Sequence, residues 1–219
     1  MRSMVYELGL RLQTTDFTDA SQSKAIATQL KHDLGNAISD CILCLLRAHS
    51  GHEEKYFFSA VQPFDPDVVE LMMREHGEVV RRILRVSSTC DELIGVEKPD
   101  RRIELGDRLN MEANDLFAFY LDHLNNEESA MVPIMWERFT DEQLREIRSK
   151  FYDGLPLNRF EDWMRWTLPA LNENELIVFF GGMKKEPGPR FGDLVRLAKE
   201  TLGAERWQVV QQRAGLGSA

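Results

Sequence analysis

The 219-residue sequence has few of the features that mark secreted, membrane-spanning or nucleic-acid-binding proteins. It contains three cysteines, no apolar N-terminal segment with a small-residue cleavage site, and no apolar run near the ~20 residues that a membrane-spanning helix needs. Its 27 basic residues are scattered and outnumbered by 36 acidic ones, which gives a net charge of −9. These absences argue against a disulfide framework, a membrane and a nucleic-acid partner, and they predict a soluble, cytoplasmic protein.

The alternation of β-branched residues that is typical of strands is nearly absent, whereas apolar residues recur every three or four positions along the whole chain. This period predicts an all-α fold. We expect an antiparallel up-down four-helix bundle over residues 1–140, and a C-terminal extension of short helices over 141–219 that packs against the bundle as a cap. The sequence does not indicate the oligomeric state.

Capping residues and helix breakers give approximate bounds for the four long helices. The third helix opens with a capping aspartate followed by proline, and a polar loop over 96–100 separates it from the fourth. The predicted ranges are 1–14, 20–62 with an interruption or bend at Gly35-Asn36, 65–95, and about 101–138.

Polar residues of metal-ligand type occupy core positions on three of these helices. The stripe of the second helix is Ile38, Ile42, Leu45, His49, Glu53, Tyr56 and Ala60. That of the third is Val69, Met72, Met73, His76, Val79, Val80, Ile83 and Leu84, and that of the fourth is Leu109, Ala113, Leu116, Tyr120, His123, Glu127, Met131 and Ile134. The second and fourth helices therefore each present a histidine and a glutamate one turn apart on the core face.

The heights of these residues along the bundle predict that they meet. If the second and third helices turn back near Phe64, the His49/Glu53 pair and His76 both lie roughly 18–20 Å from that end, at ~1.5 Å per residue. The same count across the next turn leaves His76 and the His123/Glu127 pair about 7 Å apart in height. Buried carboxylates are costly without a partner, so a bound cation would explain the pattern. In the alternative interpretation, each histidine is a hydrogen-bonded core residue and each glutamate a solvated one.

The sequence leaves the roles of two neighbouring residues, His52 and Glu128, undecided. His52 is either close to the site or exposed, and Glu128 could replace Glu127 as a ligand. Glu54 is expected to face solvent.

A second class of function is suggested by residues 32–36. The sequence His32-Asp33-Leu34-Gly35-Asn36 is similar to the short phospho-acceptor motif of two-component histidine kinases, although no glycine-rich nucleotide box follows it. The alternative hypothesis is therefore a helical phosphotransfer or adaptor bundle that uses His32 and holds no metal.

The spacing of the ligand-type residues resembles that of the hemerythrin-like (HHE cation-binding) family. The three segments that carry the resemblance begin at His49, Glu75 and His123, and they follow a His-x-x-x-Glu, His, His-x-x-x-Glu order. The stretch after the last motif, residues 132–144, and the helical tail over 163–172 are also similar to those of bacterial members.

The resemblance implies a four-helix bundle with a non-haem iron centre, mono- or di-iron, that binds or senses oxygen or nitric oxide or handles iron. The implied protein is a metal-binding protein rather than a turnover enzyme, and zinc or manganese could compete for its site. The implied ligands are His49, Glu53, His76, His123 and Glu127.

Two departures from the family pattern predict an incomplete site. Residues 1–14 contain no histidine, where the family's first helix supplies one, and Val80 stands where oxygen-carrying members place a second histidine. Counting back along the bundle places the missing histidine at or before Met1, so we expect weak or absent metal in this form of the chain.

Overall fold

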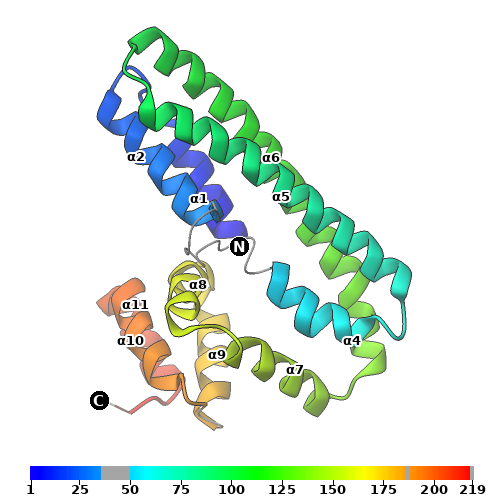
Figure 1. The fold of residues 1–219 in the computed structure, drawn as a ribbon. Helices are drawn as coiled ribbons and strands as arrows, with labels where there is room; N and C mark the ends of the chain where they lie inside the picture. Colours follow the sequence, from blue (N-terminus) through cyan, green and yellow to red (C-terminus); the bar gives the residue numbers. More distant parts are fainter. Residues whose placement is uncertain (36–49, 186–187, 218–219) are drawn as a thin grey trace. The chain divides into compact units, whose positions relative to one another are not determined.

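The computed structural model describes residues 1–35, 50–185 and 188–217, and every regular element within them is helical. The prediction of an all-α fold is confirmed. The chain divides into two compact units, one over residues 2–155 and one over 156–219 (Figure 1). None of the described helices has the length and apolar character needed to cross a membrane.

The first unit is built on two long helices that form a hairpin, with shorter helices packed along them. Helices α1 and α2 lie against α6 and α5 respectively and contact each other, while α7 packs against the turn η2 (Figure 1). The bounds are α1 Arg2–Gln13, α2 Ala20–Leu30, the π-helical turns η1 Lys31–Gly35 and η2 Glu54–Phe58, α4 Ser59–Val61, α5 Pro66–Gly95, α6 Pro99–Arg138 and α7 Asp141–Asp153.

Local capping chemistry sets the ends of the two long helices. The Asp65 side chain accepts a hydrogen bond from the Val68 amide at 3.0 Å, and Pro66 supplies the first residue of α5, as predicted. Helix α6 begins at Pro99, two residues before the predicted start, and shortens the predicted loop. Proline suits the first helical position because its missing N–H would have no intrahelical partner there.

The buried stripe of α5 is narrower than predicted. Met73 and Leu84, assigned to the core, are each 47% exposed. The buried residues instead repeat with alternating spacings of three and four, and Val69, Met72, His76, Val79 and Ile83 begin this series. With one dominant partner helix, α6, only this narrow seam is covered, so residues one position off it reach the edge.

A close approach between Gly106 of α6 and the loop after α1 anchors that loop to the long hairpin. A Cβ at Gly106 would lie 2.3 Å from Cγ of Phe17. Beside it, the buried Arg102 donates to the Phe17 and Thr18 carbonyls at 3.0 and 2.6 Å.

Replacing Gly106 by alanine should therefore destabilise the protein by about 1–3 kcal/mol, because the Phe17 ring would have to move away from its packing position against Gly106. Gly77→Ala on α5 is the matched control, since a Cβ there has no neighbour within 4 Å. The control should gain about 0.5–1 kcal/mol from helix propensity. Urea unfolding followed by circular dichroism measures both, and equal stabilisation of the two variants would contradict the assigned contact.

The second unit has a core of its own. Its helices are α8 Leu157–Ala170, α9 Glu173–Lys185, α10 Phe191–Thr201 and α11 Ala204–Arg213, with α8 packed on α10 and α9 on α11. Phe180 and Trp207 form an edge-to-face pair at 5.4 Å, and Leu168 and Leu197 are fully buried. The predicted packing of this region against the bundle stays a prediction.

Candidate metal centre

Two histidines meet between the long helices of the first unit. His76 of α5 and His123 of α6 are 3% and 2% exposed, and their ring centroids lie 4.9 Å apart in an edge-to-face arrangement. The narrow seams of α5 and α6 face each other, so both side chains turn inward at one level. Two of the five predicted ligands are thus neighbours across α5 and α6, while their role as ligands stays a prediction.

Each of these histidines is held by a glutamate through its Nδ1 atom. His76 Nδ1 lies 2.8 Å from Glu54 Oε1, and His123 Nδ1 lies 2.7 Å from Glu75 Oε2. An ionised carboxylate only accepts hydrogen bonds, so each Nδ1 carries the proton and donates it. The lone pair of each ring is then on Nε2, which is the arrangement typical of metal-binding histidines.

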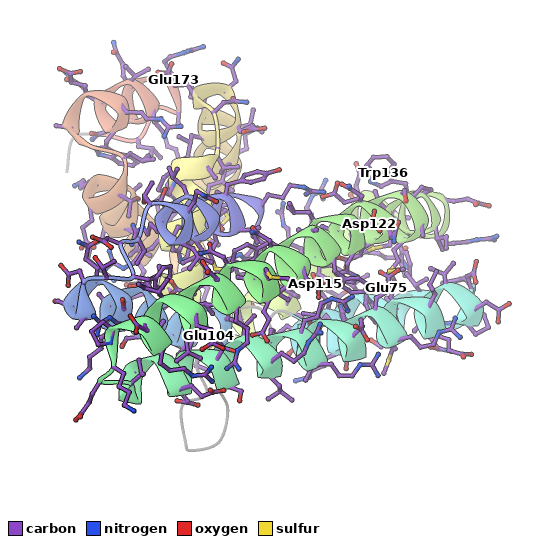
Figure 2. All side chains as sticks on the ribbon, turned by 90° about the horizontal axis from the view of Figure 1, so that it is seen from above. Glu75, Glu104, Asp115, Asp122, Trp136 and Glu173 are labelled. Carbon is purple, nitrogen blue, oxygen red and sulfur yellow. The ribbon has the colours of Figure 1, made fainter. Side chains whose placement is uncertain are left out.

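Glu75 also connects to a second residue of α6. Its Oε1 accepts from Asn126 Nδ2 at 3.0 Å, so its carboxylate spans one turn of the neighbouring helix. Figure 2 shows Glu75 where α5 and α6 run side by side. This double contact fixes the carboxylate and, through it, the His123 ring.

The sequence pattern did not reveal the roles of Glu54 and Glu75. Glu54 was expected to face solvent, but it is only about one-third exposed and contacts His76. Glu75 precedes His76 directly, which gives no signal of its own, because its partner lies on another helix 48 residues away.

Glu53 is 5% exposed and its Oε2 lies 3.6 Å from His76 Nε2, too far for a good hydrogen bond. His76 Nε2 is buried and has no hydrogen-bond partner among the described residues. Burial lowers the pKa of His76 and favours its neutral form, although the hydrogen bond to Glu54 opposes this shift. A neutral imidazole with an unused buried lone pair is suited to bind a cation.

The π-helical turn η2 changes which of the residues after Glu53 are buried. Tyr56 and Ala60, predicted on its face, are only partly buried, whereas Phe58 and Val61 are 1% and 0% exposed. A π-helical turn contains an extra residue, so the core face moves from positions i+3 and i+4 to i+5. Phe58 then stacks on the His76 ring at 4.9 Å.

Glu127 lies on α6 one turn after His123 and is partly buried. Burial raises its pKa to about 8, and the negative charges of Glu53 and Glu128 add to the rise. Glu128 itself is 61% exposed and pairs with Arg2 at 2.6 Å, so it faces α1. Of the two glutamates, Glu127 therefore is the one that points toward the interior.

Tyr120 completes the set of polar groups at this level. It is 1% exposed, its ring lies 6.0 Å from that of His123, and its hydroxyl has no hydrogen-bond partner among the described residues. Burial raises its pKa well above the ordinary value, with the carboxylates of Glu53 and Glu127 contributing. The interior thus holds polar atoms and negative charge that a cation would satisfy.

The remaining sequence predictions are placed as follows. His49 lies outside the described residues. His52 is partly buried, and its ring packs on Tyr56 and on Phe151 of α7, at 5.7 and 5.6 Å. Across residues 1–35, 50–185 and 188–217, no three histidine, cysteine or acidic side chains lie in an arrangement that could hold an ion.

An all-helical unit with paired, carboxylate-held histidines between two long helices defines a candidate cation-binding helical protein. Residues 9–135 match the model of the hemerythrin HHE cation binding domain, and the chain belongs to this family. The match includes all five predicted ligands. No curated protein and no solved structure matches the chain.

Proposed function

We propose that this protein binds iron between α5, α6 and the segment around η2, and that the centre serves to bind or sense oxygen or nitric oxide, or to handle iron. The observation that carries the proposal is the unused His76 Nε2, buried beside the Glu53 carboxylate. His76 and His123 would supply nitrogen ligands, and Glu53 and Glu127 oxygen ligands, together with His49.

This donor set indicates which metals compete for the site. Imidazole and carboxylate together suit ferrous iron and manganese, and zinc binds the same atoms. When bound, iron would supply a redox-active position for a diatomic ligand. The residues of this chain would hold the ligating rings, keep water out through Phe58 and Tyr120, and release the proton held on Glu127.

The test is metal analysis of the full-length protein after loading. Metal-free protein is incubated with Fe(II), Mn(II) or Zn(II) without oxygen, desalted and measured by atomic emission. Because residues 1–14 contain no histidine and Val80 stands where a second one is expected on α5, we expect weak retention, below one iron per chain but above that of an unrelated helical protein. Retention no higher than that of an unrelated helical protein would contradict the proposal.

Glu75→Gln should weaken iron binding about 10- to 100-fold, because the amide holds the His123 ring less firmly and does not raise its basicity. Glu112→Gln is the matched control. Glu112 also bridges α5 and α6, by accepting from the Thr89 hydroxyl at 2.6 Å, but it does not contact either histidine. Competition with a coloured chelator measures both affinities, and equal values would remove Glu75 from the centre.

Iron affinity should rise with pH up to about 8, since Glu127 must lose its proton to bind the metal. One displaced proton gives about 10-fold tighter binding per pH unit between pH 7 and 8 and a plateau above. The metal-free fold should show the opposite trend. It holds a proton that the unfolded chain has lost, so its Tm should fall as pH rises through this window.

Calorimetric titration in buffers of different ionisation enthalpy counts the released proton, and thermal melts give Tm. Glu127→Gln should abolish the fall in Tm between pH 7 and 8. A fall of the same size in that variant would show that another group is responsible.

A further inference from the structure

His32, which lies outside the candidate metal centre, has the surroundings of a reactive histidine. His32 lies in the turn η1, directly after α2, with 54% of its side chain exposed. Its Nδ1 lies 2.9 Å from Oδ1 of Asp33, and Asp33 itself is 2% exposed. An exposed imidazole is thus fixed from below by a buried carboxylate.

The Asp33 carboxylate is held in turn by α2, and the turn η1 is held to α5. Asp33 Oδ2 accepts from Gln29 Nε2 at 2.5 Å, and Lys31 in the same turn pairs with Asp91 of α5. Because a carboxylate oxygen accepts this hydrogen bond, Nδ1 of His32 carries the proton and Nε2 presents its lone pair to solvent. Histidines activated as nucleophiles or bases are oriented in this way, and π-helical turns are frequent at functional sites.

The surroundings of His32 suit an anion. The ring borders an open groove of about 570 Å³ along α2, whose polar lining includes Lys24, Ser21 and Thr28. These residues share one face of α2 with His32, and helical side chains lean toward the N-terminus, so Nε2 faces this polar stretch. No carboxylate is among the described residues that line the groove.

We propose that His32 accepts a phosphoryl group on Nε2 from a small acyl phosphate. The Nε2 lone pair forms a bond to phosphorus while the bond from phosphorus to the acyl oxygen breaks, and the carboxylate leaves with the electron pair. Nδ1 keeps its proton, and Asp33 balances the positive charge that develops on the ring. The Lys24 ammonium balances the phosphoryl charge, and the Ser21 hydroxyl in the same groove is available to donate a hydrogen bond to it. This site goes beyond the iron centre and does not depend on it.

Incubation of the full-length protein with acetyl phosphate tests the proposal. We expect one phosphoryl group on His32, located by fragmentation mass spectrometry under alkaline conditions and assigned to Nε2 by phosphorus NMR. Asp33→Asn should slow its formation at least ~10-fold, since loss of an orienting carboxylate costs more than this in enzymes. Asp67→Asn, an exposed residue in the first turn of α5, is the matched control and should leave the rate unchanged.

The proposal would be overturned by equal labelling of His32→Gln, by attachment at Nδ1, or by an unchanged rate in Asp33→Asn with a native circular dichroism spectrum. Absence of any labelling would also overturn it. The iron content of His32→Gln is expected to equal that of the unchanged chain, so failure of the iron proposal and failure of this one are distinguishable.

Discussion

The double variant His76→Ala/His123→Ala should retain no more iron than an unrelated helical protein, under loading conditions in which the unchanged protein retains a measurable amount. The two rings lie within 4.9 Å of each other, and each is already oriented through Nδ1. Disturbing even an orienting partner costs 10- to 100-fold in affinity, so removing two ligands should cost more.

His32→Ala is the control for this experiment, because it also removes an imidazole but lies in η1. Circular dichroism and a urea titration establish that each variant is folded. If the double variant is unfolded, the single variant His123→Gln provides the same comparison with a smaller change in volume. Iron retention equal to that of His32→Ala would contradict the assignment of the centre.

Phe58→Ala should reduce the free energy of unfolding by about 3–5 kcal/mol, the second large effect we expect. Phe58 is 1% exposed, stacks on His76, and packs in a cluster with Val61, Val69, Met72 and Met131. Truncation leaves a cavity that the surrounding helices can close only in part. The variant should also bind iron more weakly, because the His76 ring loses its support.

Phe64→Ala is the matched control, since Phe64 is 47% exposed and its ring lies against the Phe139 ring and Arg138 at the protein surface. It should lose about 1 kcal/mol or less. Urea unfolding gives both values. A loss at Phe58 as small as that at Phe64 would show that the interior around His76 is loosely packed.

Features that depend on local sequence were predictable. The start of α5 at Pro66 follows from a cap and a proline within three residues, and the inward positions of His76 and His123 follow from the helical period. The errors at Met73 and Leu84 arose because the period gives the direction of a buried face but not its width. The width depends on how many helices cover it.

Features that depend on contacts between helices were not predictable. In the sequence, nothing distinguishes Glu75 from a surface glutamate. Its role depends on contacts with His123 and Asn126 of α6. The raised pKa of Glu127 depends in part on the negative charge of Glu53, which comes from another segment of the chain. The close contact between Phe17 and Gly106 depends on the path of the loop after α1. The likeness of residues 32–36 to a phospho-acceptor motif was visible early, but the burial of Asp33 beneath an exposed His32 was not.

The sequence by itself determined that this chain is all-α, that α5 begins at Pro66, and that histidines and glutamates of ligand type point into its interior. These properties follow from the helical period and from capping groups, which act over a few neighbouring residues. Only the tertiary structure decided which carboxylate holds which imidazole ring, which nitrogen keeps a lone pair, and which buried polar atoms have no hydrogen-bond partner among the described residues. Hydrogen bonds form within about 3 Å, and no pattern along one helix specifies the register of another at that scale.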